Sequence, residues 1–291
     1  MCQKEIRSRF LTKLTNGEVE DYLERNDLIY IPVGTIETHG ALPLDCETVL
    51  AEAFALKMAE ATDGLVLHNL PYFYAGATPV GRGTIQMSIA DGMAYLDKLA
   101  QSLLNQGFRR QVYVSLHGPA YLTVSSMVRD FFDKTKAPVL YMDMITAISN
   151  VQKNPPKNPF DKINEMLVGC YSVMGRLEDV PLNVPESESV SYDLEECMKK
   201  MGGHPSSKLS HLAYQSGSVG FYFDKPADHA YTPLIRTEEE REVLAEKGVE
   251  AINEVVQSLD MPKILEALRE VDEFTQTNSL PKYGEWLPKT K

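Results

Sequence analysis

The chain has 291 residues, of which 43% are hydrophobic and 24% are charged, and its formal net charge at pH 7 is −12. No run of about eighteen apolar residues is present to span a bilayer, and the negative charge argues against a nucleic-acid or anionic-membrane partner, because phosphate groups are bound by basic surfaces. We therefore expect a soluble globular protein that binds a small molecule, with no nucleic-acid partner and no membrane partner.

The cysteines and the N-terminus indicate the compartment. Four cysteines are scattered along the chain without a CxxC pair, which fits neither a zinc knuckle nor a dense disulfide framework. The N-terminal sequence MCQKEIRSRF is not followed by the apolar core of a secretory signal. Both features predict a cytoplasmic protein.

The first half of the chain alternates helical and strand patterns. Apolar spacing predicts a surface helix over residues 11–25, followed by a short buried strand that begins at Leu28. Further helices are predicted over residues 48–64, 89–107 and 122–134, and further strands over residues 65–74, around Val112 and Val114, and within residues 137–147. This order of strands and helices predicts a parallel sheet with right-handed crossovers.

The second half is less regular. Residues 153–162 are too rich in proline for a helix, and helices are predicted over residues 163–177 and 238–259. The segment GSVGFYFDKPADHAYTPLIRT, residues 217–237, is expected to line a pocket. We expect residues 1–272 to form a single α/β domain with a lid or excursion at about residues 153–215, and residues 273–291 to form a polar C-terminal tail.

The stretch LIYIPVGTIETHGALPLDCET carries the first part of a candidate site. Glu37 and His39 are two residues apart, so in extended backbone their side chains leave the same face, and Asp45 and Glu47 follow in the same loop. His117 comes directly after a later predicted strand. Because the carboxyl ends of neighbouring parallel strands meet at one crevice, we expect Glu37, His39 and His117 to converge there and to bind a divalent metal.

Other interpretations of these residues are open. The stretch is alternatively a solvated acidic loop without a metal, or Cys46 is a reactive thiol at a helix N-terminus with His39 as its base. Arg82 lies between two glycines in the loop AGATPVGRGT, which is a predicted pocket wall. It either binds a carboxylate of a substrate or is solvated.

The motifs of the chain resemble those of the creatininase family of metal-dependent amidohydrolases. The first family motif runs roughly Pro-Val-Gly-Ser-x-Glu-x-His-Gly-x-His-Leu-Pro-Leu-x-Thr-Asp-Thr, and residues 32–48 follow it with one residue fewer and with Glu47 in place of its aspartate. GTI at residues 83–85 resembles a Gly-Thr-Ile segment of the family, and SLHGPA at residues 115–120 stands where the family has Asn-Gly-His-Gly-Gly-Asn. The resemblance extends over residues 15–258, where AEKGVEAINEVV resembles the closing helix of the family.

The resemblance implies a three-layer α/β/α sandwich with a mostly parallel central sheet, a two-metal site of zinc or manganese, and a homo-oligomer, commonly a hexamer. Carried over by position, it makes Glu37, His39, Glu47 and His117 the metal ligands, with Glu47 bridging. The later family motif His-Ala-Gly-Glu-x-Glu-Thr-Ser falls on NEMLVGCY at residues 164–171, so its histidine and its glutamate are absent. The second histidine of the first motif is deleted as well.

These features predict a metal-dependent hydrolase that acts on an amide-like C–N bond of a small substrate such as a cyclic amide. Metal-activated water would attack the carbonyl, and protonation of the leaving nitrogen needs a carboxylate, for which Glu165 and Asp45 are the candidates. The alternative is a non-catalytic or single-metal binding protein on the same fold, in which the missing residues leave one ion or none. The substrate, the metal and the number of ions are left open by the sequence.

Overall fold

The computed structural model describes residues 6–68, 70–76, 80–151, 159–205, 209, 223–229 and 231–286. In this part of the chain a sheet of parallel strands lies at the centre, in the order β2-β1-β3-β4. The strands are β1 (Leu28–Pro32), β2 (Leu65–Val66), β3 (Arg110–Ser115) and β4 (Leu140–Asp143). Because β1 and β3 are neighbours, their carboxyl ends meet at one edge of the sheet.

Helices connect the strands and continue beyond the last of them. The α-helices are α1 (Asn16–Leu23), α2 (Cys46–Thr62), α3 (Ile89–Asn105), α4 (Ala120–Thr135), α5 (Met144–Val151), α6 (Pro159–Val173), α7 (Leu194–Gly203), α8 (Glu238–Leu259), α9 (Met261–Phe274) and α10 (Leu280–Tyr283). Shorter turns are the 3₁₀ helices η1 (Leu11–Lys13), η2 (Leu177–Asp179) and η5 (Pro226–Asp228), and the π-helical turn η6 (Thr275–Ser279) between α9 and α10.

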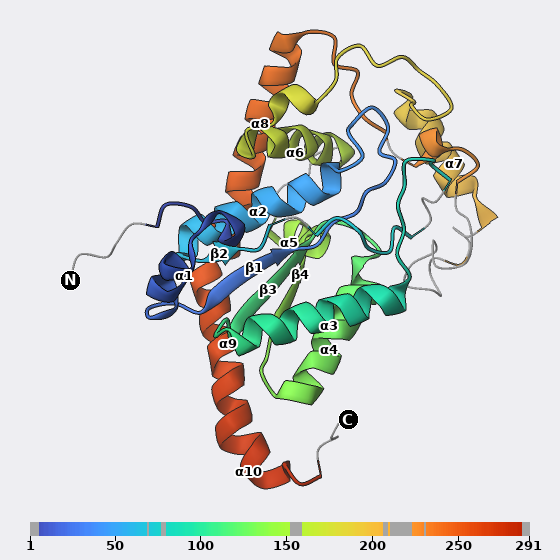
Figure 1. Ribbon diagram of the computed structural model, residues 1–291. Coiled ribbons are helices and arrows are strands. Elements are labelled where there is room, and N and C mark those ends of the chain that lie inside the picture. Colours follow the sequence, from blue (N-terminus) through green and yellow to red (C-terminus); the bar gives the residue numbers. More distant parts are fainter. Residues whose placement is uncertain are drawn as a thin grey trace.

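Helices cover both faces of the sheet, which gives the three-layer α/β/α sandwich that the family resemblance implied (Figure 1). Successive side chains of a strand point to opposite faces. Leu28 and Tyr30 of β1 therefore pack with α2, α5, α6 and α8, whereas Ile29 and Ile31 pack with α1, α3 and α4. All four side chains are fully buried, as expected for a parallel strand covered on both sides.

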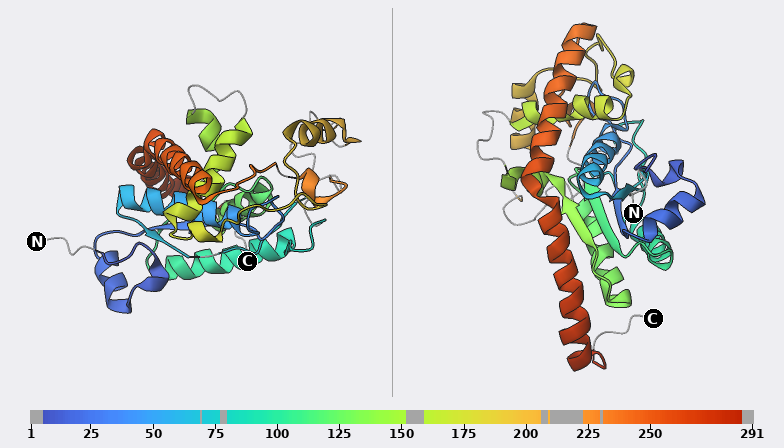
Figure 2. Two further views of the ribbon diagram at one scale, coloured as in Figure 1. Left: turned by 90° about the horizontal axis from the view of Figure 1, so that it is seen from above. Right: turned by 90° about the vertical axis from the view of Figure 1, so that its left-hand side faces the viewer.

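On one face the helices form two rows. Helix α2 contacts β1 and β3 on its inner side and α6 and α8 on its outer side, so it lies between the sheet and the outer pair (Figure 1). Helices α8, α9 and α10 follow one another along one flank of the molecule and extend past the sheet (Figure 2). Helix α2 is thereby held between the sheet on one side and α6 and α8 on the other. Its N-terminal end contributes to the site described below.

Two predicted strands are shorter than expected. β2 ends at Val66 rather than continuing to residue 74, because the chain leaves the edge of the sheet and the carbonyl of Leu70 instead accepts a hydrogen bond from the amide of Gly34 at 3.1 Å. β4 ends at Asp143, whose carboxylate accepts hydrogen bonds from the amides of Ile145 and Thr146 and so begins α5. The sequence missed this helix start because the residues on both sides of it are apolar.

The predicted lid contains a helix of the core. Met166, Leu167 and Tyr171 of α6 are buried, although residues 153–215 were expected to form an excursion. Parts of that prediction, and of the expected pocket segment at residues 217–237, fall on residues 153–158, 206–208, 210–222 and 230, which lie outside the described residues. The predicted tail is helical as far as Tyr283. None of the described helices combines the length and the apolar character needed to cross a membrane.

The contact between α6 and α8 yields a prediction about stability. The two helices touch at Gly169 and Gly248, and a Cβ at Gly248 would overlap the backbone of Glu165. Gly248→Ala should therefore lower the free energy of unfolding by about 1–3 kcal/mol, as measured by urea denaturation. Gly17→Ala in α1 is the matched control, because a Cβ there meets no atom within 4 Å. Equal effects of the two substitutions would contradict this account of the helix contact.

Candidate metal centre

The turn after β1 carries the first candidate residues to the carboxyl edge of the sheet. Val33 continues the pairing with β3 by donating its amide to the carbonyl of Val114 at 2.8 Å. At Gly34 the backbone passes so close to Thr48 of α2 that no side chain fits. The loop then folds back on itself through a hydrogen bond of 3.0 Å from the amide of Glu37 to the carbonyl of Leu44. Glu37 is thereby fixed beneath the start of α2.

Glu37 and His117, which are buried, form a cluster at this point with the partly buried Glu47. The Nδ1 atom of His117 lies 2.6 Å from Oε2 of Glu47 and 3.3 Å from Oε1 of Glu37. Glu37 is 1% exposed and His117 is 4% exposed. One atom from each of the three side chains lies within 4.8 Å of the others, so the three groups are close enough to share one cation.

The charges in this cluster depend on one another. Burial raises the pKa of Glu37, and the negative charge of Glu47 raises it further. The pKa of Glu47 is lowered although burial opposes this, because His117 and His39 favour its charged form. Burial lowers the pKa of His117, but Glu37 and Glu47 together raise it well above its ordinary value. In the absence of a metal, the protonated imidazole of His117 therefore faces the ionised carboxylate of Glu47, while the raised pKa of Glu37 favours the protonated form of that carboxyl group.

Neighbouring groups fix the orientation of the cluster. The Nε2 atom of His117 lies 2.9 Å from the carbonyl oxygen of Tyr74, which can only accept, so Nε2 carries a proton and Nδ1 faces the carboxylates. The hydroxyl of Thr35 donates to Oε2 of Glu47 at 3.0 Å, and that of Thr48 donates to the carbonyl of Thr35 at 3.0 Å. A metal-binding histidine typically donates its second N–H to a carbonyl or carboxylate in this way.

The donor set fits a divalent cation. Two carboxylates and one imidazole nitrogen are ligands that zinc accepts, and manganese also accepts carboxylate with imidazole. The proton on Nδ1 of His117 would have to leave, together with any proton that the raised pKa retains on Glu37, and the carboxyl groups already face the imidazole. The residues that the sequence predicted as ligands thus include three that the structure brings together.

His39, the fourth predicted ligand, lies next to this cluster and beside a histidine that the sequence analysis did not select. The rings of His39 and His229 are 5.4 Å apart between centroids and nearly perpendicular, at 86°. Burial lowers the pKa of both histidines, and Glu47 partly opposes that effect at each of them. His229 lies in the segment expected to line a pocket, but nothing in the spacing of the sequence marked it.

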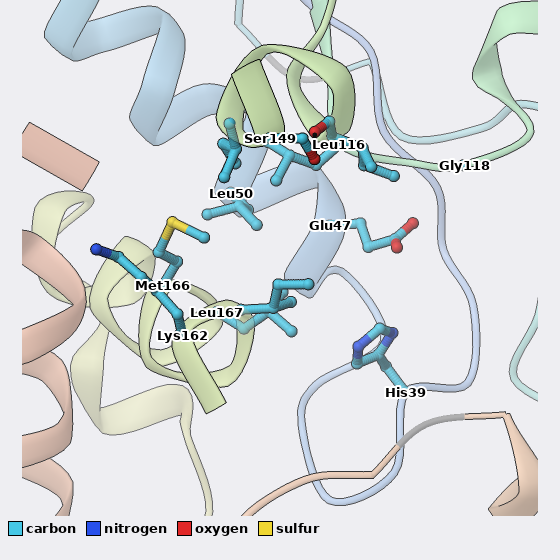
Figure 3. Close-up of a pocket in the computed structure, with 12 residues that line it drawn as sticks. His39, Glu47, Leu50, Leu116, Gly118, Ser149, Lys162, Met166 and Leu167 are labelled. Atoms are coloured by element: carbon cyan, nitrogen blue, oxygen red, sulfur yellow. Dashed lines mark hydrogen bonds between the residues drawn. The ribbon is translucent and has the colours of Figure 1, made fainter. Parts of the chain in front are cut away.

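A pocket of about 230 Å³ opens beside His39 and Glu47 (Figure 3). These two residues lie on one side of it, opposite Lys162 and Met166 of α6 (Figure 3). Most of the lining side chains are apolar: Leu50, Leu116, Ile145, Ile148, Ile163, Met166 and Leu167. The ammonium of Lys162 is paired with Glu254 at 3.0 Å, so the wall facing His39 and Glu47 is largely uncharged.

The two predicted proton donors are held elsewhere. Asp45 accepts a hydrogen bond from the hydroxyl of Tyr171 at 2.7 Å and forms an ion pair with Arg176 at 2.9 Å. Glu165 lies where α6 touches Gly248 of α8, and it is not among the described residues that line the pocket. Their predicted role in catalysis stays a prediction.

The thiol interpretation is contradicted by burial. Cys46 is 0% exposed, and burial raises the pKa of its thiol well above the ordinary value. A reactive cysteine needs the opposite combination of access and lowered pKa. Cys46 is a core residue, and its carbonyl oxygen lies 4.0 Å from Sγ of Cys170.

The glycine-rich loop covers the first motif rather than the pocket. The amide of Ile85 donates to the carbonyl of Ile36 at 2.9 Å, and the hydroxyl of Thr84 accepts from the amide of Thr38 at 3.1 Å. Gly81 and Gly83 allow close contact with Thr38 and Leu44. Arg82 between them is exposed.

Comparison with known proteins shows which protein family and which characterised enzyme the chain is similar to. The family model Creatininase, described as creatinine amidohydrolase, matches residues 12–167. A 3-dehydro-scyllo-inosose hydrolase of Thermotoga maritima is 29% identical over 115 residues, which are 39% of this chain and 37% of that protein. The matched part is thus well below two thirds of the length of that relative.

Solved structures of creatininase share the fold. A tryptophan-to-alanine mutant of creatininase superposes with a TM-score of 0.57 at 17% sequence identity, over 86% of this chain and 98% of that one. Two further creatininase structures, one described with Mn and one mutant described as Zn-Zn type, each have a TM-score of 0.53 with the same identity and coverage. At this level of identity the similarity shows a common fold.

The buried cluster yields a prediction for the metal-free protein. His117→Ala should lower the free energy of unfolding by about 3–5 kcal/mol, because Glu37 and Glu47 would then face each other in the interior without a cation. The double substitution Glu37→Gln and His117→Ala should recover part of this loss, because one of the two like charges is removed. Urea denaturation measures both effects, and a double variant no more stable than His117→Ala would contradict the charge argument.

The same cluster predicts a dependence on pH. The pKa of His117 is raised in the folded state, so its contribution to stability is fully present below the pKa of the unfolded state and is lost as the pH rises through the folded value. The difference in unfolding free energy between the metal-free protein and His117→Ala should therefore shrink at alkaline pH. A difference that stays constant as the pH is raised from 6 to the alkaline limit at which the protein remains folded would contradict the assignment of the charge to His117.

Proposed function

Because the chain belongs to the creatininase family, we propose that it is a metal-dependent hydrolase that acts on an amide-like C–N bond of a small substrate. The observation that carries this proposal is the buried cluster in which Nδ1 of His117 faces carboxylate oxygens of Glu37 and Glu47. Two negative groups and a histidine are rarely buried together unless they serve a function or bind a cation. The family match covers residues 12–167 and therefore includes all three.

Zinc and manganese are the proposed ions, since creatininase structures are described with each of them. Glu37, Glu47 and His117 would hold a divalent ion, with His39 beside them at the pocket. Such an ion supplies Lewis acidity and a bound water of lowered pKa. Thr35 keeps Glu47 oriented toward the cluster, and Tyr74 keeps His117 in the tautomer that presents Nδ1.

The pocket suggests the class of substrate. Its walls are mostly apolar, so they would exclude water from the reacting bond and accept an uncharged ring or alkyl group. The carbonyl of the substrate would lie on the side of His39 and Glu47, where the polar groups gather (Figure 3). A cyclic amide has both parts, an apolar ring and a carbonyl bonded to nitrogen.

Protonation of the leaving nitrogen is the step for which this chain offers the fewest groups. Asp45 and Glu165 remain the proposed donors from the sequence, but Asp45 would first have to leave Tyr171 and Arg176. A group that is engaged in this way is a slow proton donor. We therefore expect hydrolysis to be fastest for substrates whose leaving nitrogen is weakly basic.

A second candidate substrate is an inosose, for which the relative from Thermotoga maritima is named. A ring that carries several hydroxyl groups needs several polar partners. Among the described residues that line the pocket, Ser149 and Lys162 are the polar ones outside the cluster region, and Lys162 is paired with Glu254. The lining thus favours the less polar amide substrate.

A non-catalytic or single-metal binding protein on the same fold is the alternative to an enzyme.

We further propose a homo-oligomer in the cytoplasm, with the hexamer implied by the family resemblance. Phe274 on α9, Tyr283 on α10 and Trp286 in the turn after α10 are exposed apolar residues suited to a subunit contact, and the described cysteines are free.

Metal binding should release a proton. His117 has a raised pKa and is protonated at pH 7 in the metal-free protein, so zinc must displace about one proton from Nδ1. Isothermal titration in two buffers of different ionisation enthalpy measures this release. A binding enthalpy that is independent of the buffer would contradict the proposed ligand. His68→Asn is a matched control, because His68 lies against Glu52 outside the cluster and its loss should leave the proton release unchanged.

Activity is tested with a panel of cyclic amides and the zinc- or manganese-loaded protein. We expect ring-opening hydrolysis that is strongly reduced in Met166→Trp, because the larger side chain fills the pocket while the metal content stays unchanged. His117→Ala should lose both activity and metal. Hydrolysis that proceeds equally well in His117→Ala would contradict the proposed function, and a loaded protein that hydrolyses no member of the panel would favour the binding-protein alternative.

A further inference from the structure

Two exposed isoleucines lie at the pocket beside His39 and Glu47. Ile145 on α5 is 45% exposed and Ile163 on α6 is 36% exposed, and both line this pocket. Single exposed apolar side chains are common on protein surfaces, whereas exposed apolar residues gathered at a pocket mark a place where an apolar group binds. The two isoleucines therefore form the mouth of the pocket.

The inner part of the pocket is apolar as well. Leu50, Met166 and Leu167 line it and are fully buried. Figure 3 shows His39 and Glu47 on one side of the pocket and Met166 on the other. An apolar path therefore leads from the mouth to the side chains that carry the proposed chemistry.

The two polar residues among the described lining outside the charged end are engaged with other groups. The hydroxyl of Ser149 donates to the carbonyl of Ile145 at 2.8 Å. The ammonium of Lys162 is paired with Glu254 at 3.0 Å and points away from His39 (Figure 3). Because both groups are used in this way, a polar substituent in this part of the pocket would lose hydrogen bonds to water and gain few from the protein, which is unfavourable.

Both sides of the mouth are fixed by their surroundings. The carboxylate of Asp143 accepts a hydrogen bond from the amide of Ile145 at 3.0 Å, which holds the first turn of α5 at the end of β4. Helix α6 is held by its close contact with α8 at Gly169 and Gly248, and α5 packs against α8 as well. The described walls of the mouth are therefore preformed, and a ligand that fills it loses little free energy to rearrangement of the protein.

We propose that the substrate of this site is an amide that carries an unbranched alkyl chain, with its carbonyl beside Glu47 and the end of its chain between Ile145 and Ile163. This inference rests on the proposed function, since it names the substrate class of the same site. A group that covers the two isoleucines gains hydrophobic stabilisation that a ring confined to the inner part of the pocket does not.

The test measures the binding of straight-chain amides, from propanamide to octanamide, to protein stripped of metal so that no hydrolysis intervenes. The Kd should fall about fourfold for each methylene that enters the pocket. Carbon-13 methyl signals of isoleucine locate the ligand. Those of Ile145, Ile148 and Ile163 should shift, and that of Ile85, which is exposed outside the pocket, should not.

The variants Ile145→Ser and Ile163→Ser test the mouth. Both positions are exposed, so the substitutions should leave the fold intact, which circular dichroism verifies. The Kd of propanamide should be unchanged, whereas octanamide should bind about fourfold to tenfold more weakly than to the wild type. Val243→Ser on α8 is the matched control, because Val243 is 46% exposed and is not among the residues that line the pocket.

Three results would overturn the inference. They are a Kd that does not depend on chain length, the same dependence in both mouth variants as in the wild type, and methyl shifts confined to isoleucines outside the pocket. Each of these would show that the alkyl chain does not reach Ile145 and Ile163.

Hydrolysis by the zinc- or manganese-loaded protein separates this inference from the proposed function. A loaded protein that hydrolyses small cyclic amides but binds longer chains no more tightly would overturn the inference and leave the proposed function intact. Binding that strengthens with chain length, without hydrolysis of any amide, would overturn the proposed function and support the pocket as a site for an alkyl chain. Values of kcat/KM that rise with chain length in the wild type, and rise less in Ile163→Ser, would support both.

Discussion

The burial of Glu37 and His117 at the carboxyl ends of β1 and β3, with the partly buried Glu47 beside them, is the constraint on which the rest of the centre depends. Two carboxylates in the interior are unfavourable unless a cation accompanies them. The protonated His117 meets this need in the metal-free protein, and a divalent ion would meet it more strongly. The parallel pairing of β1 with β3 is what brings the two chain segments to one edge of the sheet.

Packing around the cluster turns it into a pocket. Helix α2 is held between the sheet and the pair α6 and α8, which fixes Glu47 in its first turn, where the helix dipole favours a negative charge. The close contact of Gly169 with Gly248 brings α6 and α8 together, and α6 in turn provides the apolar wall opposite His39. The chemistry proposed for the pocket therefore depends on helix contacts some distance from the charged residues.

The sequence predicted the order of elements, the parallel sheet and the grouping of Glu37 with His117, because hydrophobic periodicity and the ends of parallel strands follow simple rules. It did not predict that Asp45 bonds to Tyr171 and Arg176, since both partners lie more than a hundred residues away. His229 was missed for the same reason. Its place beside His39 is set by the tertiary contacts of η5, which leave no local pattern in the sequence.

Anomalous diffraction from crystals of the zinc- or manganese-loaded protein tests the central claim most directly. The account predicts an anomalous peak for a metal ion bonded to carboxylate oxygens of Glu37 and Glu47 and to Nδ1 of His117. Nε2 of His117 should still face the carbonyl of Tyr74. A loaded crystal with no peak at these three side chains, or with a peak on Nε2 of His117 instead, would contradict it.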